Sequence, residues 1–538
     1  MAKYVQHDED NSDAVDSTDS SILDPDMKTE SPFDTTEADS EILLTPSVSD
    51  ERTGLFKGTK SYKRRWYILA LWCAVGFANF EIWNTWGPIQ NTAKYTFNWK
   101  TSQISLLVNL GLFTLILFPP VFVLIIDRYG LRVAQLITAG SIAAGASIRL
   151  IIPDNSIGIC IIQDLGEFLN GIGGVLPMAA STMLSLKWFP EGERRTATAF
   201  STGTQQIGLA LSFLIGPLLV DDLKPVDMAN SSTDPNDTST VEPGPTKEEM
   251  QGQIWHYILY QSIYAVVLFV LVVVYFPRSP PKPPSEVSFS KREDLLPSVG
   301  KIVKKPKFWC LAFVYGLFSG VFNSYLSILD VDLQPKGFSQ VLAGWIGSTT
   351  TLAGAIGGVI FANLADRLRR HNPVKKLLLM LLCVGFGSFL LFVLSVKAFS
   401  LSLAANKAVV FVTVVVTGIC SASSVPLVFE MGSDILFPIS EELIGSMLVL
   451  VQNVFGSLIL AAMSIPQLGD AWLDYAVLSG VLLAIPLVLV VDDTNERGKM
   501  SETVRRQSGR SIVNSRGGTR NDYSDNDTSD DNLIIMSH

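Results

Sequence analysis

Residues 125–132 read IIDRYGLR, and residues 364–370 read LADRLRR. Each stretch carries an Asp-Arg pair at the end of a long apolar run, the second such run of its half of the chain. A motif that recurs at the same place in two halves indicates an internal repeat. We therefore expect two similar halves, each built from the same series of apolar segments.

The apolar runs have the length of membrane spans. The chain has 538 residues, of which 48% are apolar and 17% charged. About a dozen runs hold roughly 20 residues each, enough for a helix to cross a bilayer core of about 30 Å. The sequence predicts an all-α membrane protein with twelve transmembrane helices in two six-helix halves. The expected spans are 66–87, 103–126, 132–152, 158–186, 197–220, 254–276, 307–329, 341–364, 374–397, 405–429, 441–466 and 471–491.

Polar segments flank and divide the two halves. The first residues are rich in Asp, Glu, Ser and Thr and lack both helical periodicity and the basic start of a secretory signal. The middle segment begins PRSPPKPP at Pro277, a proline density typical of a spacer that does not pack. The predicted organisation is a disordered tail at 1–62, a six-helix half at 63–276, a linker at 277–306, a second half at 307–492 and a disordered tail at 493–538.

Basic residues predict the orientation in the membrane. Lys and Arg gather before the first span, after the second, fourth and eighth spans, and throughout the middle linker. Because cytosolic loops carry the excess of Lys and Arg, both termini are predicted to be cytosolic. Two N-glycosylation sequons, at Asn230 and Asn236, fall in the loop between spans five and six, which this orientation places on the luminal or extracellular side.

The Asp-Arg turns resemble the signature loop of the major facilitator superfamily, and the first turn keeps the glycine of that signature, Gly130. The resemblance implies that Asp127, Arg128, Asp366 and Arg367 gate the cytosolic side by affecting the conformational equilibrium. The alternative is that Asp and Arg at a helix end are solvated caps.

Several motifs resemble a narrower group, the feline leukaemia virus subgroup C receptor-related family. They are RRW at 64–66, WNTWGPIQN at 83–91, WF at 188–189, ER at 193–194, TATA at 196–199, AGWIG at 343–347, SSVP at 423–426, FE at 429–430 and Pro438. The resemblance covers about residues 63–492. It implies a carrier of small organic solutes: in one branch a lysosomal, proton-driven exporter of pyridoxine, in another a choline and ethanolamine facilitator, with haem also proposed.

Aromatic and amide side chains supply candidates for a solute site. An uncharged pyridine ring needs aromatic faces and a few directed hydrogen bonds. The candidates are Trp83, Asn84, Trp86, Gln205, Gln206 and Tyr325. The resemblance implies that a tryptophan and a glutamine line the cavity, positions nearest to Trp83 and Gln206. An interfacial aromatic belt is the alternative for the tryptophans, and interhelical hydrogen bonding is the alternative for the glutamines.

Carboxyl groups within the spans are candidates for proton coupling, since burial favours their neutral form. They are Glu81, Asp164, Glu167 and Glu430. A structural salt bridge from Arg149 to Asp164 or Glu167, joining the third and fourth spans, is an equal alternative. Members of the resembled family are apolar at the position of Glu81, so a role there would be particular to this chain. For Glu430 we expect gating or packing.

A short motif in the N-terminal tail predicts the subcellular localisation. Asp39 stands four residues before Leu43-Leu44, which fits the acidic dileucine signal read by clathrin adaptors. The relative in the lysosomal branch also carries a dileucine signal, so the resemblance supports a multi-pass protein of the lysosomal membrane.

Other function classes find little support in the sequence. There is no phosphate-binding glycine loop, no nucleophile elbow and no zinc-spaced histidine pair. The five cysteines lie in apolar spans without CxxC spacing, so we expect neither a disulfide framework nor a metal site. We therefore expect a monomeric carrier that is not an enzyme, uses no cofactor and binds a small solute, protons, membrane lipid and a clathrin adaptor, but no nucleic acid. A nutrient-sensing receptor that does not transport is the remaining alternative.

Overall fold

All regular structure in the described part of the chain is helical. The computed structural model describes residues 62–152, 156–190, 193–222, 245–281, 295–367, 373–397, 402–436, 439, 441–463, 465 and 472–491. These residues all belong to one contact unit, 58–538. The tails, the two sequons and the dileucine motif lie outside the described residues.

The two halves follow the apolar runs. The helices of the first half are α2 (Arg65–Trp83), α3 (Gln90–Phe97), α4 (Thr101–Leu117), α5 (Pro119–Tyr129), α6 (Leu131–Ile148), α7 (Ser156–Ala179), α8 (Ser181–Trp188), α9 (Arg194–Leu219) and α11 (Lys247–Val274). Those of the second half are α12 (Leu295–Val303), α13 (Pro306–Tyr315), the π-helix η3 (Gly316–Gly320), α14 (Val321–Ser327), α15 (Leu329–Leu333), the 3₁₀ helix η4 (Gln334–Lys336), α16 (Gln340–Arg367), α17 (Pro373–Lys397), α18 (Leu403–Ile435), α19 (Glu441–Ala462) and α20 (Trp472–Val490).

The described residues hold ten helices that are long and apolar enough to cross a membrane, or eleven when the bent pair α4 and α5 counts as one span. The predicted fifth span is α9, which has sufficient length but is less apolar. Its polar residues bond inside the bundle: Ser201 accepts from the Trp72 indole, and Ser212 accepts from the Asn84 amide. The hydropathy of α9 is low because these residues join it to α2 rather than face lipid.

The Asp-Arg turn of the first half has a backbone that only glycine adopts freely. α4 and α5 meet at an angle of 52°, where Pro119 begins the new helix. Gly130 then separates α5 from α6 with φ at +83°, and a Cβ there would lie 2.7 Å from the Nε atom of Arg278. The glycine of the signature is therefore required both by the turn and by close contact with the linker.

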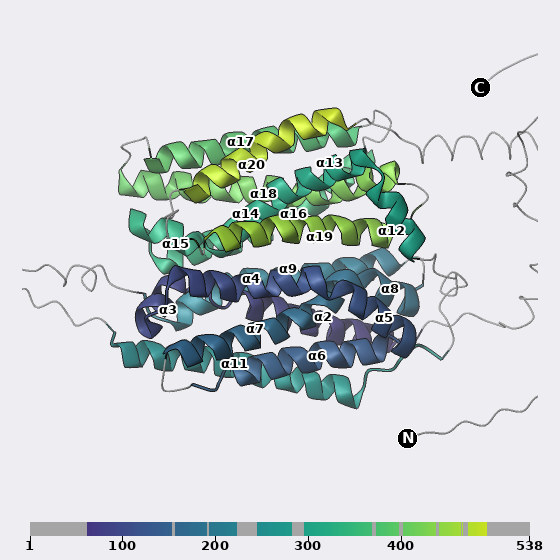
Figure 1. Ribbon diagram of the computed structural model, residues 1–538, viewed down its shortest axis with the longest axis horizontal. Helices are drawn as coiled ribbons and strands as arrows, with labels where there is room; N and C mark the ends of the chain where they lie inside the picture. The colour runs from purple at the N-terminus through teal and green to yellow at the C-terminus, as the bar shows by residue number, and fades with distance from the viewer. Residues whose placement is uncertain are drawn as a thin grey trace, which may run out of the picture. The chain divides into compact units, whose positions relative to one another are not determined.

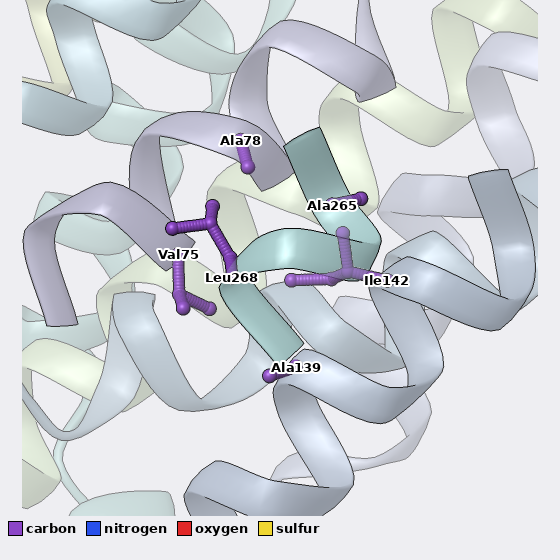
Figure 2. Close-up of a pocket in the computed structure, with 6 residues that line it drawn as sticks. All are labelled: Val75, Ala78, Ala139, Ile142, Ala265 and Leu268. Carbon is purple, nitrogen blue, oxygen red and sulfur yellow. The ribbon is translucent and has the colours of Figure 1, made fainter. Parts of the chain in front are cut away.

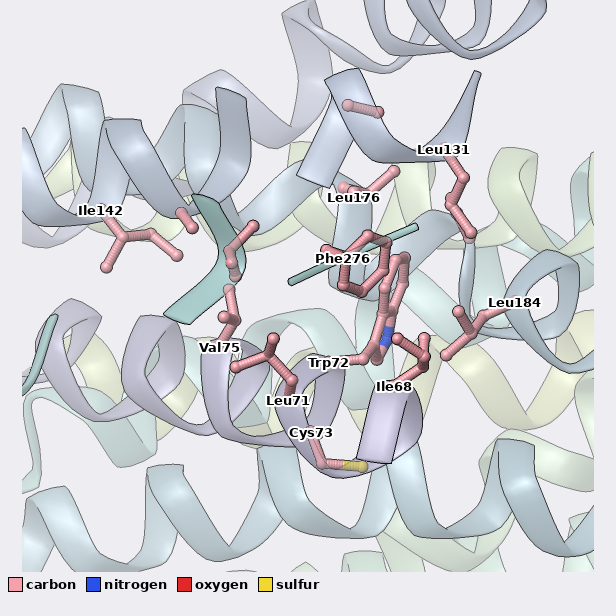
Figure 3. Close-up of a cluster of buried hydrophobic side chains, with 14 of the residues drawn as sticks. Ile68, Leu71, Trp72, Cys73, Val75, Leu131, Ile142, Leu176, Leu184 and Phe276 are labelled. Carbon is pink, nitrogen blue, oxygen red and sulfur yellow. The ribbon is translucent and has the colours of Figure 1, made fainter. Parts of the chain in front are cut away.

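Each half has its own hydrophobic core. In the first half, Trp72 is fully buried and packs among Ile68, Leu176 and Phe276 (Figure 3). A second cluster lies entirely between Ile302 and Val491. A third cluster combines both halves, with Val108, Leu112 and Phe213 beside Tyr325 and other residues of the second half. This shared cluster is where the halves meet.

The first membrane span of each half ends in a break near one end of the unit. α2 ends at Trp83 and the chain continues into the short α3, while α14 ends at Ser327 and continues into the short α15. Figure 1 shows α3 and α15 at the same end, opposite to α5, α8 and α12. We refer to it as the α3/α15 end. The predicted first span, 66–87, therefore ends earlier than expected, because the segment before Gly87-Pro88 leaves the helix.

Candidate functional site

The turn that follows α2 brings polar groups to the boundary between the halves. The Trp83 indole donates to the carbonyl of Val108 at 3.2 Å, and its ring lies against Gly111 of α4. The Asn84 amide donates to the Ser212 hydroxyl at 2.9 Å, while its Oδ1 atom is buried without a partner. Asn84 thus retains one unused acceptor next to a partly buried aromatic ring, a combination that suits a small polar solute.

Trp86 lies away from Trp83, in an aromatic cluster of the first half. It is 1% exposed and packs edge-on against Trp99, with ring centroids 5.2 Å apart. The Arg149 guanidinium stands 5.7 Å from the centroid of its ring. The structure therefore assigns Trp86 to packing and a cation-π contact, and it does not support an interfacial belt for this residue.

Arg149 joins the third and fourth spans, as the structural alternative predicted. Its NH1 atom lies 3.5 Å from the carboxylate of Glu167, and both side chains are fully buried. Its Nε atom donates to Gln163 at 3.0 Å. Asp164 is half-buried and accepts from the Cys160 thiol, so Glu167 rather than Asp164 is the partner of Arg149. The buried pair fixes the end of α6 against α7.

Glu81 occupies a polar site between α2 and α11. Its carboxylate accepts hydrogen bonds from the Tyr257 hydroxyl and the Gln261 amide, each at 3.0 Å, and from the Tyr264 hydroxyl. Glu81 is 2% exposed. The three donors are spaced four and three residues apart, so they share one face of α11. Sequence reasoning missed them, although polar residues at this spacing in an apolar helix are a detectable signal.

Gln205 and Gln206 differ in their surroundings. Gln205 is buried and its amide donates to the carbonyl of Pro177 at 3.1 Å, so it bonds between helices. Gln206 is only partly buried. Of the two glutamines, Gln206 is the more exposed.

Tyr325 lies in the second half, within a charged cluster that the sequence did not reveal. Its hydroxyl donates to the carboxylate of Asp332 at 2.9 Å, and the ammonium of Lys336 lies 2.7 Å from the other oxygen of that carboxylate. Asp474 lies 2.9 Å from Lys397 and 3.7 Å from Lys336. Burial and the Asp474 carboxylate raise the pKa of Asp332, while Lys336 opposes the shift. These contacts engage the Tyr325 hydroxyl, although its ring belongs to the hydrophobic cluster against which Trp83 packs.

Polar contacts connect the halves at the α3/α15 end. The Asn91 amide donates to the Asp330 carboxylate at 2.8 Å, and the Thr92 hydroxyl donates to the Gln340 side chain at 2.8 Å. The backbone N–H of Gln340 donates to Asp222 at 2.8 Å. The backbones also meet here, since a Cβ on Gly87 would lie 2.0 Å from the carbonyl oxygen of Ser327. This end of the bundle is closed.

The predicted gating residues lie at the opposite end. Asp127 and Arg128 are exposed in the last turn of α5, and Arg367 is exposed at the last residue of α16. Asp366 precedes it in the same helix, and Glu430 is partly buried in α18. None of these positions coincides with the Trp83 to Asn84 turn. Asn230, Asn236, Asp39, Leu43 and Leu44 lie outside the described residues.

An apolar crevice lies beside the Glu81 site. It has no room for a water molecule and is lined by Val75, Ala78, Ala139, Ile142, Ala265 and Leu268 (Figure 2). Ala78 is almost one turn before Glu81 on α2, and Ala265 follows Tyr264 on α11. A lining without polar atoms cannot direct a hydroxylated or charged solute. We therefore place the candidate solute site at the Trp83 to Asn84 turn and not in this crevice.

Comparisons with known proteins identify the family of this chain. The sequence profile of the Major Facilitator Superfamily matches residues 51–464. The solute carrier family 49 member 4 homolog of Xenopus tropicalis is 28% identical over 82% of this chain and 94% of its own. The human choline/ethanolamine transporter FLVCR2 is 24% identical over 74% of this chain and 71% of its own.

Solved structures share the fold. A D-xylose-proton symporter aligns with a TM-score of 0.56 at 15% identity, over 80% of this chain and 98% of its own. A bacterial homolog of the human lysosomal transporter Spinster, in an inward-facing and unoccupied conformation, aligns with a TM-score of 0.54 at 15% identity, over 81% of this chain and 96% of its own. The family match makes the chain a multi-pass membrane transporter and not an enzyme: it belongs to the Major Facilitator Superfamily.

Proposed function

We propose that this transporter is a monomer of the lysosomal membrane that exports a small organic nutrient from the lumen to the cytosol by alternating access, driven by protons. Pyridoxine is the favoured cargo. Both termini face the cytosol, so the α3/α15 end faces the lumen.

The buried carboxyl of Glu81 is the observation that carries this proposal. Its hydrogen-bond donors are two tyrosine hydroxyls and an amide, all of them neutral, and the charge of Arg149 acts on it only at longer range. A carboxylate inside a membrane span is costly, and binding a proton removes its charge. Glu81 lies on α2, six residues before the contact of Gly87 with the second half. A proton on Glu81 can therefore affect the helix that takes part in closing the carrier.

The cargo is proposed from the Trp83 to Asn84 turn and from the family resemblance. The Trp83 ring offers a face for stacking, and the Oδ1 atom of Asn84 is an unused acceptor for a solute hydroxyl. The same ring could bind a quaternary ammonium by cation-π attraction. A choline or ethanolamine facilitator is therefore the second candidate, and similarity to FLVCR2 supports it. A haem-type carrier and a receptor without transport find no comparable support in the site.

Lysosomal localisation is proposed from the acidic dileucine motif in the N-terminal tail. An acid four residues before Leu43-Leu44 fits recognition by a clathrin adaptor, which would direct the protein to lysosomes. Replacing both leucines with alanine should retain the carrier at the cell surface, where its luminal side faces the medium.

Uptake by this surface-displayed Leu43→Ala, Leu44→Ala variant tests the function. We expect labelled pyridoxine to enter faster at an external pH of about 5.5 than at about 7.5, because a carboxyl then binds a proton before each turnover. Adding Trp83→Ala should abolish uptake, and Glu81→Gln should remove its pH dependence. The matched control is Trp345→Ala, which removes a tryptophan that is 49% exposed on α16. Choline uptake at the same rate at both pH values would favour a choline or ethanolamine facilitator. Uptake of neither solute would favour a receptor that does not transport.

A further inference from the structure

Asp330 is a buried carboxyl in the contact between the halves at the α3/α15 end. It is 2% exposed. Its Oδ2 atom accepts from the Asn91 amide at 2.8 Å and from the Asn91 backbone N–H at 3.5 Å. Its Oδ1 atom is buried and has no hydrogen-bond partner. One oxygen of the carboxyl thus holds the two halves together, while the other is available to carry a proton.

The charges around Asp330 do not compensate its own charge. In the first half, the charge of Lys94 of α3 stabilises the ionised form of Asp330, whereas the carboxylate of Asp222, after α9, destabilises it. From the second half, Asp332 of the same helix and Lys336 of η4 contact each other and face Asp474. Lys336 is therefore already engaged by two other carboxylates.

The neighbouring carboxyls at this end differ from Asp330. Asp332 has an ammonium partner at 2.7 Å, and Asp222 is only partly buried. Burial, with the Asp222 carboxylate adding to it, raises the pKa of Asp330 from 3.8 to about 7, although the Asn91 donors and Lys94 oppose the shift. A group with this pKa changes its charge in the range between an acidic organelle and the cytosol.

We propose that Asp330 is a proton-binding site in the gate at the α3/α15 end, and that proton binding favours the closed gate. The proposal goes beyond the transport function above, and its test requires no cargo. The gate consists of Asn91, Thr92 and Asp222 in the first half and Asp330 and Gln340 in the second.

Linkage between proton binding and gate closure determines which state of the gate acid favours. When the gate opens, water reaches the carboxyl and its pKa returns towards 3.8. A proton then binds the closed state more tightly than the open state, so acid favours closure and neutral pH releases it. With these two pKa values, the closed-to-open ratio at pH 5 is about 70-fold higher than at pH 7.5. An acidic lumen would therefore close the gate behind a loaded solute.

Electron-electron distances between two spin labels test the proposal on the purified full chain. Bioorthogonal labels at Lys100, just before α4, and at Leu403, the first residue of α18, leave the five cysteines unchanged. Both sites are exposed. Lys100 lies between α3 and α4, and Leu403 lies beside Gly337, which follows α15 and η4, so the two sites belong to different halves at the α3/α15 end. We expect the short-distance population to grow as pH falls from about 7.5 to about 5. A ratio of short to long distances that is the same at both pH values overturns the proposal.

Three variants identify the responsible carboxyl. Asp330→Asn keeps an acceptor for Asn91 but cannot titrate, so it should remain closed at both pH values. Asp222→Asn, the matched control, removes a carboxylate from the same gate. It should keep the pH response with its midpoint moved to lower pH, while Lys94→Gln should move the midpoint to higher pH. A full pH response in Asp330→Asn overturns the proposal.

Direct titration of the Asp330 carboxyl tests the proposal even when the open state is too rare to detect by the distance measurement. Difference infrared spectra of protein with labelled aspartate should show a carboxyl band that disappears near pH 7 and is missing in Asp330→Asn. If no aspartate of the parent chain titrates near this pH, the proposal is wrong, whatever the distances show.

Discussion

Glu81 illustrates how this chain keeps a carboxyl group inside a membrane span. The tyrosine hydroxyls of Tyr257 and Tyr264 and the amide of Gln261 all point at it from α11. A buried donor without an acceptor costs about 1–3 kcal/mol, so the acid and its three donors stabilise one another. The carboxyl therefore joins α2 to α11 in addition to any role in proton transfer.

The stability of two Glu81 variants should differ for this reason. Glu81→Gln keeps an acceptor for the hydroxyls, whereas Glu81→Leu leaves both tyrosine hydroxyls buried and unpaired. We expect Glu81→Leu to be less stable than Glu81→Gln by about 2–6 kcal/mol, the cost of two such donors. Thermal unfolding of the purified variants in one detergent measures the difference. Equal unfolding temperatures would contradict the assigned hydrogen bonds.

The broken helices α2 and α14 set the contact between the halves. Because Gly87 has no side chain, its backbone reaches the carbonyl of Ser327, and Asn91 and Thr92 of α3 then meet Asp330 and Gln340. The Gly87-Pro88 pair after α2 is consistent with this break, because both residues disfavour a continued helix. Nothing in the sequence showed which segment of the second half would lie opposite, because that depends on how the halves pack.

A methyl group on Gly87 should open the gate by steric conflict. Its Cβ would lie 2.0 Å from the Ser327 oxygen. Overpacking of this kind costs about 1–3 kcal/mol, which lowers the closed-to-open ratio by roughly 5- to 150-fold. Gly203→Ala is the matched control, since a Cβ on that glycine of α9 meets nothing within 4 Å. The spin-label pair at Lys100 and Leu403 measures both. An unchanged distance distribution in Gly87→Ala would show that the backbones do not limit closure.

The sequence predicted some parts of the candidate site better than others. The apolar helices followed from hydropathy, and the structure confirms them. A salt bridge from Arg149 to Asp164 or Glu167 was one of two interpretations of these acids, and the structure shows the pair with Glu167. Trp86 was expected in a solute site but lies in a core cluster, because its neighbours Phe97 and Trp99 come from the end of the short helix α3 and the turn after it, which hydropathy does not reveal. The donors around Glu81 and the partners of Asp330 come from distant segments, so only the packed structure identifies them.

At the scale of the whole molecule, two repeats pack against each other and share one hydrophobic cluster. The described contacts close the α3/α15 end, and the Trp83 to Asn84 turn lies where α2 breaks near that end. In a carrier of this superfamily, alternating access requires that the same halves separate here and load the solute. In the function proposed above, the position of the turn connects solute binding to the gate.

Uphill transport by the purified protein in liposomes tests the central claim most directly. With an acidic outside medium and a neutral interior, a proton-driven carrier must accumulate labelled pyridoxine inside above the external concentration, and a protonophore must abolish the accumulation. We predict this result for the parent chain and its loss in Glu81→Gln. Entry that stops at equal concentrations on both sides, with or without the proton gradient, would show a facilitator and contradict proton-driven export.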